Sequence, residues 1–479
     1  MRAALSAAVA LSGLVAMAGV VTGPVLSQQQ DGTSSGPPLA RNVVVVLTDD
    51  MRADELAALP HVRRLIGDQG VRFSTAYAVD PVCCPSRVSL LTGQYAHSSG
   101  VEDNVFPRGG FEAFDDRSSL ATWLDRAGYT TGYVGKYLNQ YGNSAPRYVP
   151  PGWDVWKAPV RGVYAYRDPA VYNINGDLEE LPGYQTDTVT SLATGFIRAH
   201  ASEPMFLHVS YVAPHEATIN GRLGRPPVPA RRHQHAFDGA LPPLDDPGYD
   251  EPDVTDKPPE VRLPRMTAPQ LARTRVFAEN RLESLLSVDE GVAQIVRSLR
   301  TQGVLANTTI VFSSDNGLML GEHRYPTEKK LVYEPSSRVP LLVRGPGLPT
   351  GVVRHHVVGL HDLAPTLLAQ TRAEAPRRFT IDGRNLVPLM RDGSGTATGR
   401  DLLIESLDKD SSWRSYDAIR TTSGYVYAEY AGRGVELYNL AEDPSQTTNL
   451  AGRPQHAGLQ RRLAVRLSQV RDCAGQGCR

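Results

Sequence analysis

The chain has 479 residues, with 50 basic and 51 acidic side chains and a formal net charge of −1 at pH 7. A chain of this length can form one large domain and a smaller one. The balanced charge gives no electrostatic reason to expect a nucleic acid or an anionic lipid surface as a partner.

The first 30 residues are predicted to lie outside the folded domain. An uncharged run of small and apolar residues extends from Ala3 to Val21 after Arg2, and small residues continue to Ser27. This pattern is typical of a secretory signal peptide cleaved near Ser27, with residues 31–41 as a polar linker. It predicts a secreted or cell-surface protein. A retained membrane anchor is the alternative, because the run is just long enough to cross a bilayer, and a membrane is expected as a partner only in that case.

The first predicted strand is Asn42–Leu47, whose run of valines is typical of a parallel strand covered on both faces. It ends in Asp49 and Asp50, which places two carboxylates at the carboxyl end of a central strand. Adjacent carboxylates at such a position are costly unless a positive group binds them, and this edge is where α/β sheets bind ligands. A solvated turn is the alternative for an Asp-Asp pair considered alone.

Residues 81–95 read Pro-Val-Cys-Cys-Pro-Ser-Arg-Val-Ser-Leu-Leu-Thr-Gly-Gln-Tyr. Pro85 is typical of a first helical turn, and Gly93 of a left-handed helix end. Cys83 is therefore expected beside a helix N-terminus, where the helix dipole favours an anion, and Arg87 adds a positive charge one turn later. The pattern predicts an anion site with a reactive cysteine; two buried structural cysteines are the alternative. A tyrosine-phosphatase loop is excluded, because it requires arginine six residues after the cysteine.

Strands, polar tips and helices then alternate along the chain, and this order predicts a doubly wound α/β sheet. Residues 217–270 are Pro-rich and irregular, which is typical of a functional or mobile loop. The predicted strands are Thr130–Val134, Met205–Val212 and Thr308–Phe312, and the predicted helices are Glu55–Ile66, Leu120–Ala127, Gln185–His200 and Arg273–Gln302.

A large α/β domain is predicted over residues 42–375 and a small α+β subdomain over residues 376–479. Short alternating runs in the subdomain predict antiparallel strands, and a helix follows them. Cys473 and Cys478 are expected to form a disulfide, rather than a metal clip, which leaves Cys84 as an unpaired, buried thiol. The predicted strands are Ser415–Thr421, Gly424–Tyr430 and Val435–Leu440, and the helix is Leu459–Val470.

The polar tips of the strands supply a set of hard oxygen donors, namely Asp49, Asp50, Asp315 and Asn316. Three carboxylates and an amide oxygen favour Ca²⁺ or Mg²⁺ over zinc, and the number of protein oxygens favours Ca²⁺. His215 follows another strand end.

The segment Cys-Cys-Pro-Ser-Arg followed by Leu-Thr-Gly resembles the signature of the type I sulfatases. The resemblance implies an alkaline-phosphatase-like fold and implies that Cys83, not Cys84, is oxidised to Cα-formylglycine by a formylglycine-generating enzyme. It implies that formylglycine-83 completes the metal ligands Asp49, Asp50, Asp315 and Asn316. It also implies a cationic ring around the sulfate, formed by Arg87, Lys136, His215 and Lys329, with Lys330 as the rival of Lys329.

The mechanism that this resemblance implies is covalent. One hydroxyl of the aldehyde hydrate attacks sulfur and the alcohol leaves; the second hydroxyl is then deprotonated, sulfate is expelled and the aldehyde reforms. The resemblance implies that His215 is the acid or base near the leaving group. The chain departs from a widespread Gly-Lys-Trp-His pattern, because Leu138 stands where the second histidine would be. The base for sulfate release is therefore not identified, and Asn139 and His323 are the neighbours of this gap.

Further motifs, among them Gly-Lys-Tyr-Leu-Asn-x-Tyr-Gly and Glu-Leu-Tyr-Asn-Leu, resemble the N-acetylglucosamine-6-sulfatase branch from about Asn42 to the C-terminus. They imply a sulfated saccharide or aryl sulfate as substrate, with N-acetylglucosamine 6-sulfate as the candidate. A phosphonate monoester or phosphodiester hydrolase of the same superfamily is one alternative. A non-catalytic carbohydrate-binding relative is the other, and retention of the charged site residues argues against it.

Overall fold

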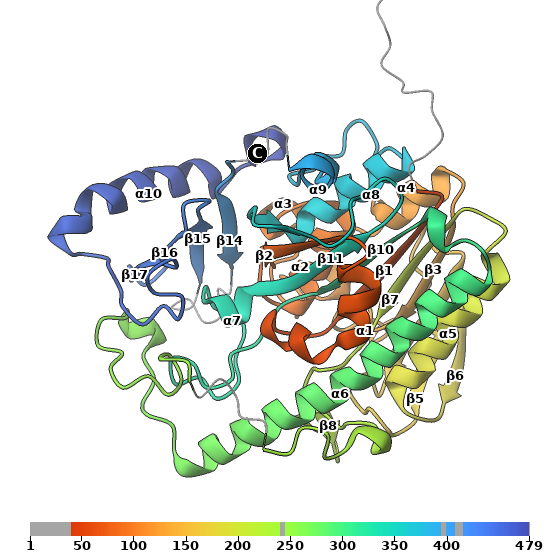
Figure 1. Ribbon diagram of the computed structural model, residues 1–479, viewed down its shortest axis with the longest axis horizontal. Helices are drawn as coiled ribbons and strands as arrows, with labels where there is room; N and C mark the ends of the chain where they lie inside the picture. The colour runs from red at the N-terminus through yellow and green to blue at the C-terminus, as the bar shows by residue number, and fades with distance from the viewer. Residues whose placement is uncertain (1–39, 240–244, 394–398, 408–414, 479) are drawn as a thin grey trace, which may run out of the picture. The chain divides into compact units, whose positions relative to one another are not determined.

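Strand β1 (Asn42–Thr48) lies near the middle of an eleven-stranded sheet (Figure 1). The strand order is β12-β2-β11-β10-β1-β7-β3-β4-β5-β6, and β13 also pairs with β2. The five strands β10, β1, β7, β3 and β4 are parallel, whereas β11 and β5 join on either side in antiparallel pairing. The prediction of a mostly parallel, doubly wound sheet is confirmed. The other strands of this sheet are β2 (Val71–Tyr77), β3 (Thr130–Gly135), β4 (Val155–Arg161), β5 (Ala170–Ile174), β6 (Asp177–Leu181), β7 (Met205–Ser210), β10 (Thr308–Ser314), β11 (Arg338–Arg344), β12 (Val352–Arg354) and β13 (Val358–Gly359).

The computed structural model describes residues 40–239, 245–393, 399–407 and 415–478. The described residues belong to one compact unit. The predicted signal peptide and nearly all of the predicted linker lie outside the described residues. Within the described ranges, no helix combines the length and the apolar character needed to span a bilayer.

Successive side chains of β1 point to opposite faces of the sheet, and each face has its own apolar core. Val43 and Val45 belong to the core that includes residues of α2, α4 and α8, whereas Val44 and Val46 belong to the core that includes residues of α5 and α6. Figure 1 shows α5 and α6 running together across one face. The helices are α1 (Pro60–Val62), α2 (Cys83–Thr92), α3 (Ala96–Ser99), α4 (Leu120–Arg126), α5 (Gln185–His200), α6 (Ala268–Thr301), α7 (Glu334–Ser337), α8 (Leu363–Thr371), α9 (Val387–Asp392) and α10 (Ala457–Val470).

Two helix predictions differ from the structure. The single helix expected at Glu55–Ile66 is a 3-10 turn, the short α1 and a π turn, because Pro60 lacks the N–H needed to continue a regular helix. Helix α6 begins five residues before the predicted start, at a capping box in which Gln270 accepts a hydrogen bond from the N–H of Thr267 (2.9 Å). The segment 217–270 contains a short hairpin, β8 (Ala217–Ile219) and β9 (Arg222–Arg225).

The C-terminal part contains a separate antiparallel sheet of four strands in the order β14-β15-β16-β17. The three predicted strands are present. Strand β14, which was not predicted, is a fourth strand at one edge of the sheet. Helix α10 contacts this sheet, and the apolar core of the sheet also includes Tyr77 of β2 and Val79. The division at residue 375 therefore stays a prediction. The strands are β14 (Leu402–Ser406), β15 (Tyr416–Arg420), β16 (Tyr425–Tyr430) and β17 (Val435–Asn439).

The cysteines are arranged as predicted. Cys473 and Cys478 form a disulfide with a Cα–Cα distance of 5.1 Å. Cys84 is a free, buried thiol within the apolar core on the α2 face. The disulfide closes a short loop directly after α10.

His97 of α3 hydrogen-bonds to two residues of the C-terminal part, Glu405 of β14 and Cys473. Its Nδ1 lies 2.7 Å from Oε2 of Glu405, and its Nε2 lies 2.8 Å from the carbonyl oxygen of Cys473. Burial alone would lower the pKa of His97, but the hydrogen bond and charge of Glu405 raise the pKa to about 9. Asp382 adds a further negative charge, and the ring of Tyr95 stacks on the imidazole.

This contact predicts a stability loss in mildly alkaline solution. A folded-state pKa above the ordinary 6.5 means that the stabilisation is complete below that value and disappears as the pH rises through about 9. We expect Tm to fall by about 1–3 °C from this group as the pH rises from about 7 to 9.5. Thermal melts of His97→Gln, which keeps a donor but does not titrate, should show a shallower slope. Equal slopes in the two proteins would contradict the assignment.

Candidate active site

The ends of β1 and β10 bring four of the predicted metal ligands together. Thr48 pairs with Ser314 in parallel register, so the residues that follow them lie side by side. The N–H of Asp50 donates to Oδ1 of Asp315 (3.0 Å), and Nδ2 of Asn316 donates to Oδ1 of Asp50 (2.7 Å). Asp50 has a left-handed backbone (φ 66°), a conformation that Asp tolerates better than most residues. The turn directs the carboxylates into one buried site.

Helix α2 places Cys83 against these carboxylates. Cys83 is the first residue of the helix, and its Sγ lies 3.6 Å from Oδ1 of Asp49 and 4.0 Å from Oδ1 of Asp50. The hydroxyl of Ser86 donates to the carbonyl oxygen of Asp315 (2.5 Å), which fastens the helix to the end of β10. Gly93 ends the helix in the left-handed conformation that the sequence predicts (φ 75°).

Arg87 lies one turn into α2 with its guanidinium buried. Its Nε donates to Oδ2 of Asp315 (2.8 Å), and its Nη1 donates to the hydroxyl of Ser210 (2.7 Å) and to the carbonyl oxygen of Lys136 (2.9 Å). Its Nη2 has no hydrogen-bond partner among the described residues, although Oδ1 of Asp49 lies 3.9 Å away. A buried N–H donor of this kind is available to an anion.

Two lysines complete the positive side of the site. Nζ of Lys136, which follows β3, lies 2.5 Å from Oδ2 of Asp49. Nζ of Lys329 lies 2.7 Å from Oδ1 of Asp50 and 3.0 Å from Sγ of Cys83. Lys330 points elsewhere, with its Nζ 2.7 Å from Oδ1 of Asp103.

His215 follows β7 at the same edge of the sheet. Its Nδ1 lies 2.8 Å from the carbonyl oxygen of Glu216, which can only accept, so Nδ1 carries a proton. Its Nε2 therefore faces the site, 3.6 Å from Oδ2 of Asp50. Burial lowers the pKa of His215 to about 4. The free imidazole is thus neutral at pH 7 with a lone pair on Nε2.

Burial and nearby charges have opposing effects on the pKa values of the other groups in the site. Burial opposes ionisation of Asp49, but the ammonium of Lys136 and other cations hold the pKa of that carboxyl below its usual range. Burial, together with the charge of Asp49, raises the pKa of Asp315 to about 6. Burial also raises the pKa of Cys83 to about 11, so its thiol is protonated at neutral pH despite the two lysines.

The buried donor atoms of the site lie close enough together to hold a metal ion. Ligand atoms of Asp49, Asp50, Cys83 and His215 all lie within 4.8 Å of one another. Oδ1 of Asn316 is buried and has no hydrogen-bond partner among the described residues, as expected of an oxygen reserved for a cation. Carboxylate and amide oxygens are the ligands that Ca²⁺ and Mg²⁺ prefer.

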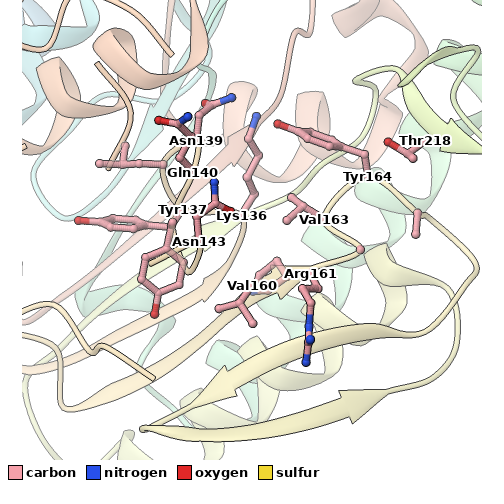
Figure 2. Close-up of a pocket in the computed structure, with 15 residues that line it drawn as sticks. Lys136, Tyr137, Asn139, Gln140, Asn143, Val160, Arg161, Val163, Tyr164 and Thr218 are labelled. Carbon is pink, nitrogen blue, oxygen red and sulfur yellow. The ribbon is translucent and has the colours of Figure 1, made fainter. Parts of the chain in front are cut away.

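Two cavities adjoin the site. The larger, of about 340 Å³, extends from Lys136 along residues 137–143 and 159–165 (Figure 2). The smaller, of about 190 Å³, is lined by Asp50, His215 and Lys329 among others. Of the described residues in the irregular segment 217–270, Thr218 alone lines the larger cavity.

Of the residues around the missing second histidine, His323 lies apart from the other two. Leu138 belongs to the apolar core on the α2 face and also lines the larger cavity. Asn139 lines the larger cavity, and its buried Oδ1 has no partner among the described residues. His323 contacts Glu251 (Nδ1 to Oε2, 2.7 Å) and the ring of Tyr333, and it lines neither of these cavities.

Four residues of the site carried no recognised sequence signal. Ser210 contacts Arg87, and the side chain of Asn104 accepts a hydrogen bond from the N–H of Cys84 (2.8 Å). Arg281 of α6 donates to the carbonyl oxygen of Asp50 (2.6 Å) and supports the turn. Tyr164 stacks on His215. Each comes from a segment distant in sequence from the residue it supports.

A buried cysteine at a helix start, carboxylate and amide oxygens and three converging cationic side chains form one site that can hold a metal ion and an anion. The comparisons place it in a family: the Sulfatase family model matches residues 41–373, and the model named N-sulphoglucosamine sulphohydrolase, C-terminal, matches residues 321–473. The chain belongs to the sulfatase family.

Several relatives carry functional names. Human N-acetylglucosamine-6-sulfatase is 30% identical, over 91% of this chain and 86% of the relative, and the arylsulfatase of Volvox carteri is 30% identical, over 91% and 75%. Extracellular sulfatases of the SULF-1 type match at 33% identity over 73% of this chain for Caenorhabditis elegans and 84% for Drosophila melanogaster. The chain spans only 49% and 36% of their respective lengths.

Solved structures confirm the fold. One is a protein in complex with its substrate D-glucosamine-2-N,6-O-disulfate, with a TM-score of 0.73 and 23% identity, covering 90% of this chain and 97% of the other. Another is the phosphonate monoester hydrolase of Silicibacter pomeroyi, with a TM-score of 0.64 and 23% identity, covering 89% and 94%. The alkaline-phosphatase-like architecture predicted from the sequence is therefore confirmed.

Proposed function

We propose that the chain is a sulfatase that hydrolyses the sulfate ester of a saccharide. The convergence of three cationic side chains on the Sγ position of Cys83 carries this proposal. Lys329 contacts Sγ directly, Lys136 lies against the neighbouring carboxylate, and Arg87 holds an unpaired donor in the same buried space. Such a set binds a tetrahedral anion next to the residue at position 83.

Two groups complete the proposed site. Ca²⁺, with Mg²⁺ as the alternative, would be held by Asp49, Asp50, Asp315 and Asn316 together with residue 83, and would polarise the sulfate ester. Conversion of Cys83 to Cα-formylglycine by a formylglycine-generating enzyme would supply a hydrated aldehyde as nucleophile. The buried, partnerless Oδ1 of Asn316 and the position of Cys83 at the helix start support these assignments.

The chain's own residues have two roles in the proposed reaction, which are binding of the sulfate and proton donation to the leaving alcohol. Arg87, Lys136 and Lys329 bind and orient the sulfate, and their fixed charges stabilise the negative charge that builds on it during transfer. His215 presents Nε2 to the ester, because Nδ1 is committed to Glu216. A bound anion favours the protonated imidazole, so Nε2 can then donate a proton to the departing alcohol oxygen.

A carbohydrate sulfate is the proposed substrate class, and N-acetylglucosamine 6-sulfate is the specific candidate. The relatives named N-acetylglucosamine-6-sulfatase and the fold neighbour bound to a disulfated glucosamine support this choice. The extracellular relatives, together with the apolar N-terminal run, support secretion after signal-peptide cleavage. Residues 42–375 are the proposed catalytic domain and residues 376–479 the proposed subdomain.

The direct test uses protein produced together with a formylglycine-generating enzyme and supplied with Ca²⁺. Release of sulfate from N-acetylglucosamine 6-sulfate and from 4-nitrocatechol sulfate is compared with hydrolysis of an aryl phosphodiester and a phosphonate monoester. Faster hydrolysis of the sulfates is expected. Preference for the phosphorus substrates would assign the alternative hydrolase activity. A modified and metal-loaded protein that hydrolyses none of them would contradict catalysis.

His215→Ala is expected to slow the sugar substrate more than the aryl sulfate. A sugar alkoxide is a poor leaving group that needs acid assistance, whereas a nitrocatecholate leaves readily without it. We expect kcat to fall by about 10²–10⁴-fold for the sugar and by about tenfold or less for 4-nitrocatechol sulfate. Steady-state kinetics on both substrates measure the ratio. Equal losses would remove His215 from the leaving-group side.

A further inference from the structure

Tyr164 lies beside the proposed sulfate site without belonging to any motif of the sequence. It is half-buried in the segment between β4 and β5. Two hydrogen bonds fasten this segment to the His215 loop: the N–H of Thr218 donates to the carbonyl oxygen of Tyr164 (2.9 Å), and the hydroxyl of Tyr166 donates to the carbonyl oxygen of His215 (2.6 Å). These two hydrogen bonds therefore hold the Tyr164 segment in place relative to His215.

The ring of Tyr164 contacts two of the four proposed sulfate-binding residues. It stacks on the imidazole of His215, with ring centroids 4.4 Å apart and an interplanar angle of 20°. Nζ of Lys136 lies 5.1 Å from the centre of the same ring, within the range of a cation–π contact. One aromatic ring thus restrains both the group proposed for the leaving-group side and a cation of the sulfate site.

The hydroxyl of Tyr164 faces the larger cavity. Figure 2 shows it directed toward the ammonium end of Lys136, with the side chain of Asn139 on the same side. The structure records no hydrogen bond of this hydroxyl to any described residue. Asn139 contributes a buried amide oxygen that also has no partner among those residues. A cavity wall with a hydroxyl that has no partner among the residues described is suited to saccharide hydroxyls, which both donate and accept.

We propose that Tyr164 is a specificity-determining residue of this site, whose hydroxyl binds the sugar of the substrate while its ring positions His215 and Lys136. The cavity of about 340 Å³ next to Lys136 then accepts the saccharide part of the sulfate ester. This assignment rests on the proposed sulfatase function. It goes further by naming Tyr164 as the residue that favours a sugar over an aryl group in the substrate. A simple aryl sulfate such as 4-nitrophenyl sulfate has no ring hydroxyl that the Tyr164 hydroxyl could bind.

Two substitutions separate the hydroxyl from the ring. Tyr164→Phe keeps the stacking and removes the hydroxyl, so KM for N-acetylglucosamine 6-sulfate is expected to rise about tenfold with a smaller change in kcat. For 4-nitrophenyl sulfate, which has no ring hydroxyl, the same change in KM should be several-fold smaller. Tyr164→Leu removes the ring as well, and kcat is expected to fall for both substrates because His215 and Lys136 lose their support. Tyr425→Phe, in the C-terminal sheet, is the matched control and should change neither substrate.

Binding measured without turnover makes the test independent of the proposed activity. Calorimetry of N-acetylglucosamine 6-sulfate with Ca²⁺-loaded Cys83→Ala protein should give a Kd about tenfold weaker after Tyr164→Phe. Failure of wild-type turnover on every ester contradicts the proposed function, and the Kd change then decides the assignment of Tyr164. An unchanged Kd, or equal KM changes for the sugar and aryl sulfates after Tyr164→Phe, would overturn that assignment whether or not the wild-type protein turns over.

Discussion

Cys83→Ala is expected to abolish sulfate ester hydrolysis, whereas Cys84→Ala retains it. Only Cys83 lies in the charged site, with Sγ 3.0 Å from Nζ of Lys329 and 3.6 Å from Oδ1 of Asp49. Cys84 belongs to the apolar core, so its loss removes buried contacts and costs stability of about 1 kcal/mol. We expect turnover to fall by at least about 10³-fold in Cys83→Ala, as for loss of a covalent nucleophile.

Mass spectrometry of the active-site peptide identifies the modified position. Conversion of a thiol to an aldehyde makes the residue about 18 Da lighter, and this change is expected at Cys83 and not at Cys84. The Cys84→Ala protein is the matched control, because it should keep both the lighter residue and the activity. If Cys84→Ala lacks the aldehyde and is inactive although folded, the modification does not depend on position 83 alone and the assignment is wrong.

Local sequence patterns predicted most of the fold because the pattern of apolar residues in a strand or helix follows from which of its faces are buried. The valine run of β1 is buried on both faces, and the apolar stripe of α6 faces the sheet, so both show their environment in their composition. The helix expected at Glu55–Ile66 was wrong because one proline outweighed an otherwise helical pattern. Strand β14 was not recognised, since its short run lacks the alternation of its three neighbours, and all five of its residues are buried.

The strand-end argument also located much of the site. Asp49 and Asp315 follow adjacent parallel strands, and register alone places them together. The structure separates Lys329 from Lys330 through the left-handed backbone of Lys330 (φ 63°), which turns the two neighbours toward different carboxylates. A linear motif with two adjacent lysines does not reveal this difference.

Other parts of the site depend on contacts between distant segments. Tyr164 reaches His215 across 51 positions of the chain, and Arg281 reaches the carbonyl of Asp50 across 231. Neither residue type is unusual for a strand connection or a long helix, so composition gives no signal. The cavity beside Lys136 gave no sequence signal for the same reason, because the separate segments 137–143 and 159–165 line it.

The carboxylates at the strand ends lead us to expect that a bound cation stabilises the fold. Asp49, Asp50 and Asp315 are almost fully buried and close together. Burial, and after it the charge of Asp49, raises the pKa of Asp315 to about 6. Lysines and Arg87 offset part of this repulsion. The oxygen of Asn316 has no hydrogen-bond partner among the described residues, and the ammonium groups of Lys136 and Lys329 are directed to Asp49 and Asp50 instead.

Removal of the metal is therefore expected to abolish turnover and to lower Tm together. Binding at about 100 times Kd stabilises a folded protein by about 2.7 kcal/mol, and chelation removes that contribution while leaving the carboxylates to repel one another. Ca²⁺ should restore both Tm and activity. Asn316→Ala should need more Ca²⁺ for the same Tm, whereas Asn307→Ala, the same change at the exposed opposite end of β10, should not. Full activity and an unchanged Tm in protein shown by elemental analysis to be metal-free would exclude the cation from both roles.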